Sequence, residues 1–144
     1  MKLMKIASMR AVLVLCLVVA FGLIGCAGKG APQKVNCDAK ITWQVAEEAK
    51  LTQFDCAVGM HGSLPSLIFT VGLENAADKP YRYRVNIFLE DMDKAAGHLV
   101  PRKPRKDKLP LLEPGKGETV KIPFIGTGNQ SKKILVIVKT ISVD

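Results

Sequence analysis

The sequence predicts a single all-β domain built as a sandwich of two sheets. Apolar and polar residues alternate over short segments that recur about every ten residues, which is typical of half-buried strands. The segments between them are rich in glycine, proline, asparagine and aspartate, and no stretch has the periodicity of an amphipathic helix. About seven strands result, and they favour an immunoglobulin-like or transthyretin-like sandwich over residues 35–144.

The first two strands are expected near the start of this domain. Residues 41–45 alternate as Ile-Thr-Trp-Gln-Val, and Phe54, Cys56 and Val58 place apolar side chains on one face of a second strand. Residues 46–49 either extend the first strand or form a helical turn. The run Gly59-Met60-His61-Gly62-Ser63 is expected to break the second strand.

Two further strands have the clearest alternation in the chain. Residues 67–73 place Leu67, Phe69, Val71 and Leu73 on one face, and residues 81–90 alternate apolar positions with mainly polar ones. The turn-forming composition of residues 74–80 separates these strands. Residues 91–97 predict another turn, after which residues 99–100 form a short extended piece.

The last strands follow a segment that cannot be a core strand. Residues 101–110 contain three prolines and five basic residues. Residues 119–125 alternate again, and Pro123 marks them as an edge strand, because proline cannot donate to a ladder. The unbroken apolar run 134–138 predicts a central strand that is covered on both faces.

The N-terminus has the pattern of an export signal. Lys2, Lys5 and Arg10 form a basic n-region, and residues 11–24 form an uncharged h-region of about 14 residues, which is short for a membrane span of roughly 20. The sequence Leu23-Ile24-Gly25-Cys26 closes this region and resembles a bacterial lipobox. The resemblance implies cleavage of residues 1–25 and lipidation of Cys26. An uncleaved anchor helix and plain secretion are the alternatives.

A lipidated Cys26 implies a palmitate-bearing lipoprotein tethered to an envelope membrane by residues 26–34, a small and flexible linker. The resemblance also bears on the compartment: Ala27 stands where lipoproteins of an inner membrane often carry Asp. The outer membrane is therefore the expected location, with the domain facing the periplasm.

Composition limits the mature chain to one domain. Of the 144 residues 119 remain after cleavage, and the net charge falls from +8 to +5 because three basic residues are lost. This balance and the export signal argue against a nucleic-acid partner. Cys37 and Cys56 remain as an even pair in an oxidising compartment, so a disulfide is expected, worth about 3 kcal/mol. Two buried thiols, or a metal site with His61, are the alternatives.

A family resemblance covers residues 67–141. Its motifs are Leu73-Glu74-Asn75, Lys79-Pro80-Tyr81-Arg82-Tyr83-Arg84, Phe88-Leu89-Glu90-Asp91, Leu112-Glu113-Pro114-Gly115 and a closing aliphatic strand. In this order they resemble the YcfL-type small periplasmic lipoproteins. The resemblance implies a β-sandwich and a periplasmic location, and no defined activity. The long basic insertion at residues 101–108 and the Cys37/Cys56 pair depart from that family.

The candidate binding residues are basic. Five cations occur within residues 102–108 and create a positive potential that attracts phosphate, carboxylate or anionic headgroups. They are Arg102, Lys103, Arg105, Lys106 and Lys108. Arg82 and Arg84 extend this patch if Tyr83 faces the core. The alternative is a solvated loop that keeps a sheet edge from pairing with another chain.

No motif of a catalytic or metal site is present. His61 and His98 stand near glycines without ligand spacing, and neither serine at 63 or 66 lies in a nucleophile elbow. We therefore expect no enzyme activity, metal or cofactor besides the covalent lipid. The expected function is that of an accessory subunit which binds an envelope protein. The alternative is a binder of anionic lipid, lipopolysaccharide or peptidoglycan through residues 101–108.

Overall fold

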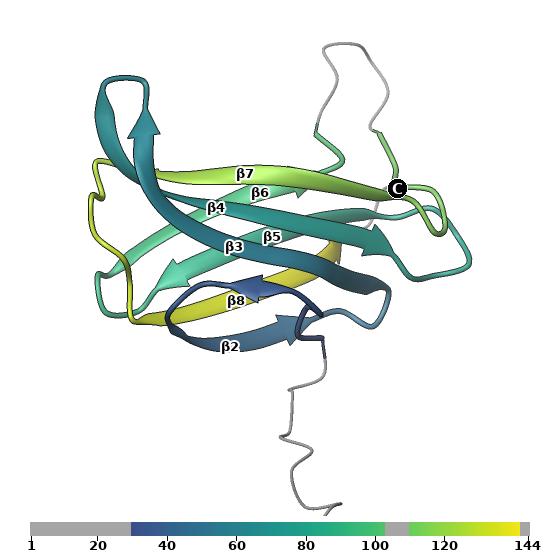
Figure 1. The fold of residues 1–144 in the computed structure, drawn as a ribbon. Helices are drawn as coiled ribbons and strands as arrows, with labels where there is room; N and C mark the ends of the chain where they lie inside the picture. The colour runs from purple at the N-terminus through teal and green to yellow at the C-terminus, as the bar shows by residue number, and fades with distance from the viewer. Residues whose placement is uncertain (1–29, 103–109, 142–144) are drawn as a thin grey trace, which may run out of the picture.

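The computed structural model describes residues 30–102 and 110–141, and these residues form the predicted all-β sandwich (Figure 1). Eight strands are present, one more than predicted. They are β1 (Val35–Asn36), β2 (Lys40–Val45), β3 (Ala49–His61), β4 (Leu64–Asn75), β5 (Arg82–Leu89), β6 (Lys94–Val100), β7 (Gly117–Ile125) and β8 (Lys133–Ile141).

The strands make two four-stranded sheets. Sheet A has the order β1-β3-β4-β7, and sheet B has the order β2-β8-β5-β6. Only β1 on β3 and β2 on β8 pair in parallel; the other neighbours are antiparallel. The described residues contain no helix long and apolar enough to cross a membrane.

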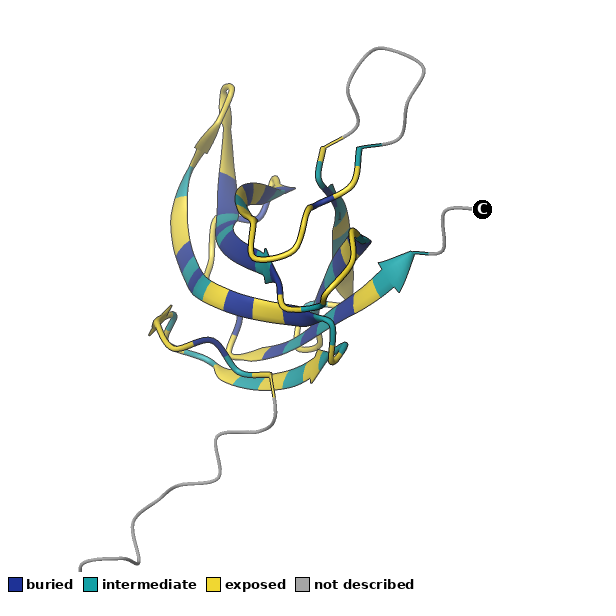
Figure 2. Cartoon of the chain, turned by 90° about the vertical axis from the view of Figure 1, so that its right-hand side faces the viewer, coloured by how far each residue is buried: buried dark blue, intermediate teal, exposed yellow. Residues whose placement is uncertain are grey.

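The core lies between the two sheets and is built from the alternation visible in the sequence. The inward positions of β4 and β5 are fully buried, among them Leu67, Phe69, Val85 and Ile87. Figure 2 shows the resulting alternation of buried and exposed residues along the strands. Trp43 of sheet B packs edge-on against Phe54 of sheet A with centroids 5.0 Å apart, and Phe54 contacts Phe69 of its own sheet at 5.4 Å.

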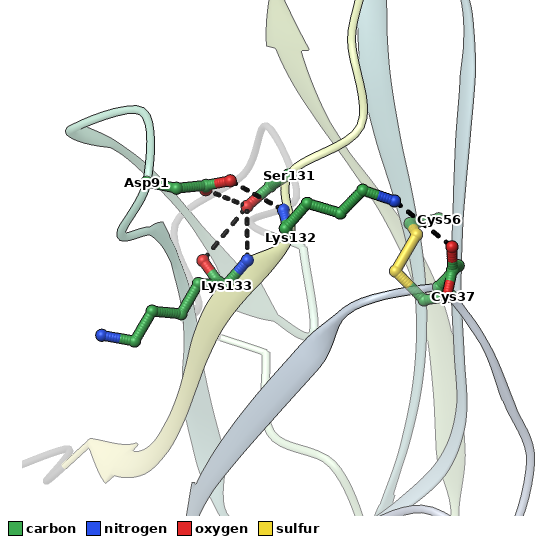
Figure 3. The surroundings of a disulfide bond; sticks show 7 residues. Cys37, Cys56, Asp91, Ser131, Lys132 and Lys133 are labelled. Atoms are coloured by element: carbon green, nitrogen blue, oxygen red, sulfur yellow. Dashed lines mark hydrogen bonds and ion pairs between the residues drawn. A yellow bond between two sulfur atoms is a disulfide. The ribbon is translucent and has the colours of Figure 1, made fainter.

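A disulfide ties the β1–β2 connection to sheet A at the start of the domain, and the predicted Cys37–Cys56 pairing is confirmed. The chain passes from β1 in sheet A to β2 in sheet B through Cys37, which is bonded to Cys56 of β3 across a Cα–Cα distance of 5.0 Å. Beside it, Lys132 reaches Asp38 with its Nζ at 3.3 Å (Figure 3). The β1–β2 connection is therefore held to strands that lie far from it in the sequence.

The turn between β5 and β6 is held to the start of β8. The Asp91 carboxylate accepts hydrogen bonds from the Ser131 hydroxyl and from the backbone N–H of Lys132, the latter at 2.7 Å (Figure 3). These bonds favour the ionised form and lower the pKa of Asp91 below its ordinary value.

Three sequence predictions about strands were wrong. Strand β3 continues through Gly59 to His61, and β6 begins at Lys94, so residues 59–61 and 94–97 are strand and not turn. Pairing with β4 and β5 respectively holds these glycine-containing segments extended. Strand β8 is central as predicted, but Leu135 and Ile137 on its outer side are only half-buried, because no strand or helix of the described residues covers that side of sheet B.

Candidate functional site

Most of the basic segment lies outside the described residues. This applies to Lys103, Arg105, Lys106 and Lys108, and also to the lipidation candidate Cys26. Arg102 is described, and its backbone N–H lies 3.4 Å from the Glu118 carboxylate of β7.

The two arginines of β5 have different environments. Tyr83 faces the core, so Arg82 and Arg84 lie on the outer side of sheet B, as the alternation predicts. Arg84 is exposed, whereas Arg82 is 4% exposed and its Nε and Nη2 have no hydrogen-bond partner among the residues that the structure describes. Arg82 therefore does not present a cation at the surface beside Arg84.

Both histidines line one groove on the side of the sandwich where β6 and β7 face each other. Lys94 Nζ donates to Thr127 Oγ1 at 2.7 Å at one end of this side, and Arg102 approaches Glu118 at the other. The groove between them has a volume of about 850 Å³. Its lining includes Met60, His61, Ile68, His98, Arg102, Glu118, Lys121 and Pro123.

The groove is cationic and partly apolar. Arg102 and Lys121 carry positive charge, and Glu118 is the single acid in the lining. The Nδ1 of His98 lies 2.7 Å from the Leu99 carbonyl, so this nitrogen carries the proton and leaves Nε2 for other partners. No group of three or more histidine, cysteine, aspartate or glutamate side chains within residues 30–102 and 110–141 is arranged to hold a metal ion.

Among residues 30–102 and 110–141, no strand pairs with one edge of β3 over much of its length. Its partner β1 is two residues long and pairs only with Phe54 and Asp55. The Phe54 N–H donates to the Lys34 carbonyl at 2.9 Å, so even-numbered residues after it direct their backbone groups away from β4. The N–H and C=O groups of Val58 and Met60 consequently face the open side of sheet A.

Apolar side chains surround this open edge. Val58 is 47% exposed, Met60 60% and Leu64 50%. They lie on the hairpin of β3 and β4, which extends beyond the other strands at the upper left of Figure 1. Ile125 is also exposed, but it lies on β7, on the far side of β4 from this edge. We name Val58, Met60 and Leu64 the hairpin patch.

After Asp55, the open edge of β3 has none of the features that normally protect an edge. Natural edges carry lysines, prolines or bulges that oppose pairing with another chain. No Lys, Arg, Asp or Glu occurs between Asp55 and Glu74 in the sequence, and the bulge of β3 lies at Leu51/Gln53, away from the open part. By contrast, β7 has Pro123 and Lys121 and faces β6.

The sequence pattern does not predict this edge, because the run Gly59-Met60-His61-Gly62-Ser63 indicates that the strand ends before residue 59. The signal that identifies it is the 18-residue interval from Cys56 to Leu73, which has no charge although it includes a surface hairpin. The chain matches no protein-family model, and comparisons with curated proteins and with solved structures find no match either.

Proposed function

We propose that this chain is a lipid-anchored envelope protein without catalytic activity, which binds an extended segment of a partner protein along the open edge of β3. The lipobox-like sequence at Cys26 supports the anchor. The observation that carries the binding role is the uncharged β3 edge with the exposed Val58 and Met60. The resemblance to the YcfL-type lipoproteins also supports this proposal, because it implies a β-sandwich that faces the periplasm.

Strand addition suits this edge for two reasons. Backbone N–H and C=O groups of Val58 and Met60 provide hydrogen bonds to an incoming strand, and apolar side chains at alternate positions provide its specificity. A membrane tether raises the effective concentration of the edge near a partner in the same envelope. Because the interface is formed by backbone bonds and apolar contacts, salt has little effect on it.

Site-specific photo-crosslinking in intact envelopes tests this role. A benzoylphenylalanine at position 58 or 60 is expected to crosslink to one protein, whereas the same group at Thr70, on the outer side of the same sheet, is not. The crosslink from position 58 should be lost in a Met60→Lys background, since lysine opposes pairing at an edge, and it should persist at high salt.

The control is Lys116→Glu, which changes charge in the turn before β7, at the end of β4 opposite the hairpin, and should leave the crosslink intact. Equal crosslinking from positions 58 and 70, or a product that is insensitive to Met60→Lys, would contradict binding at the β3 edge.

A second candidate function is binding of anionic envelope material through residues 101–108. The supporting observation is that Arg102 and Lys121 share one groove with both histidines. This function predicts that the amount of lipid, lipopolysaccharide or peptidoglycan recovered with the tagged protein falls as the salt concentration rises. Recovery should also fall when Arg102, Lys103, Arg105, Lys106 and Lys108 are all changed to serine.

A further inference from the structure

The start of the described chain restricts where a lipid anchor can lie. Gly30 packs against Val45 at the end of β2 so closely that a Cβ on it would be 2.5 Å from the Val45 Cβ. Cys26 precedes Gly30 by four residues, which span at most about 14 Å even when fully extended. A domain of this size has a radius of gyration of about 13 Å. A lipid on Cys26 would therefore hold the β2 end of sheet B near the membrane surface.

The outer side of sheet B is both basic and apolar. Its exposed cations come from three neighbouring strands, with Lys40 on β2, Arg84 on β5, and Lys133 and Lys139 on β8. Between them lie the half-buried side chains of Phe88, Leu99, Leu135 and Ile137. The register places these residues in adjoining rows: Phe88 is opposite Leu135, and Arg84 is opposite both Lys139 and Leu99.

Within the part of the chain that the structure describes, the acids of this face lie at its ends. Glu90, after β5, pairs with Lys133 at 3.4 Å, and Glu47 lies in the turn after β2. The outer side of sheet A differs, because Lys50 and Lys121 are balanced there by Asp55 and Glu74. The two faces of the sandwich therefore differ in charge, and the basic face belongs to the sheet whose edge strand lies against Gly30.

From this arrangement we infer that the outer side of sheet B lies on an anionic lipid bilayer. The inference rests on the proposed lipid anchor at Cys26. Cations near a negatively charged membrane surface are attracted to its headgroups, and apolar side chains between them contact the interface. The short tether makes this contact effectively intramolecular, so weak attraction by a few cations is sufficient.

The same orientation leaves the hairpin patch free. The 13 residues of β3 run from Ala49, near the β2 end, to His61, a distance of about 40 Å in an extended strand. The hairpin in Figure 1 accordingly rises at the end opposite the point where the described chain begins. A partner at the β3 edge and a membrane under sheet B do not compete for the same surface.

Lysine acetylation of the purified lipidated protein tests the inference. The protein is placed in vesicles of phosphatidylglycerol and phosphatidylethanolamine, in phosphatidylcholine vesicles, or in detergent, and acetylation rates are measured by mass spectrometry. In the anionic vesicles Lys40 and Lys139 should react about fivefold more slowly than in detergent. Lys50 and Lys121 of sheet A are internal controls, and their rates should not change.

Matched variants test the contribution of charge. Arg84→Gln with Lys139→Gln should weaken the attraction about 30-fold and restore the reactivity of Lys40 in anionic vesicles. Lys50→Gln with Lys121→Gln removes the same charge from sheet A and should leave Lys40 protected. Circular dichroism of both variants checks that the sandwich is retained.

Several results would overturn the inference. These are slower reaction of Lys50 and Lys121, equal protection of all lysines, equal protection in phosphatidylcholine, or protection of Lys139 in detergent that grows with protein concentration. The last result would show that a second copy covers this face. The intact mass of the protein reports the anchor separately. An unmodified Cys26 refutes both the proposed tether and this inference. If Cys26 is lipidated but the protected lysines are not those of sheet B, only the orientation is refuted.

Discussion

The Tyr83 hydroxyl lies 2.8 Å from the side-chain oxygen of Asn75, and both residues are fully buried. The same hydroxyl lies 2.8 Å from the Glu48 carbonyl. The Asn75 amide donates to the carbonyls of Lys79 and Leu112 at 2.8 and 2.7 Å. One asparagine thus joins the end of β4 to the loops before β5 and β7, and Tyr83 connects it to the turn before β3.

Removing Asn75 should destabilise the domain more than removing the Tyr83 hydroxyl. Asn75→Ala leaves two carbonyls and the tyrosine hydroxyl with fewer partners in a buried site, which should cost about 3 kcal/mol of unfolding free energy. Tyr83→Phe removes one hydroxyl and should cost about 1 kcal/mol. Urea unfolding of both variants checks this, and a larger loss for Tyr83→Phe would refute the central role of Asn75.

Burial raises the pKa of the Tyr83 hydroxyl to about 12, with a smaller contribution from the negative charge of Glu48. The folded state therefore retains this proton between pH 10 and 12, where an unfolded tyrosine loses it. Stability should accordingly be unaffected by this group below pH 10 and should fall as the pH rises toward 12. Tyr83→Phe should flatten this alkaline decline in unfolding experiments, whereas an unchanged slope would assign the decline to other groups.

The sequence was sufficient to predict the sandwich because its inner strands follow simple alternation. Leu67, Phe69 and Val71 on β4, and Val85 and Ile87 on β5, are buried as their period of two predicts. The cysteine pair was predictable for a different reason: after a lipid is assigned to Cys26 and Cys16 is removed with the signal, two thiols remain. Cys37 and Cys56 form that bond.

Local sequence did not predict the extent of β3 and β6, because glycine there has a tertiary role. A Cβ on Gly97 would lie 2.5 Å from the Asn86 side-chain oxygen, so the glycine in β6 permits close contact with β5 and does not mark a turn. Strand β1 was missed because two exposed residues, Val35 and Asn36, have no detectable periodicity. The open edge of β3 arises because a strand of 13 residues lies beside β1, which has only two residues.

The Cys37–Cys56 disulfide should stabilise the domain by about 3 kcal/mol, since it closes a loop with a sequence separation of 19 residues. Unfolding of the wild type with and without reductant, compared with the Cys37→Ser/Cys56→Ala variant, measures this value. Reductant should have no effect on the double variant. Because the bond lies next to the β1–β3 pair, the Phe54 amide should exchange with deuterium faster in that variant. Unchanged exchange at Phe54 would mean that β1 is held without the disulfide.

Proline scanning can test the hydrogen-bond direction assigned to the open edge of β3. The Val58 N–H faces away from β4, so Val58→Pro removes no ladder bond and should change the unfolding free energy by less than about 1 kcal/mol. Gly59 directs its backbone toward Ser66 of β4, so Gly59→Pro breaks the ladder and should cost about 3 kcal/mol. Urea unfolding separates the two variants.

If Val58→Pro destabilises the domain as much as Gly59→Pro, the Val58 N–H has a partner within the fold and the edge is not open. If Val58→Pro is tolerated but abolishes the crosslink from position 60, the same backbone group that is unused in the fold is needed for the partner.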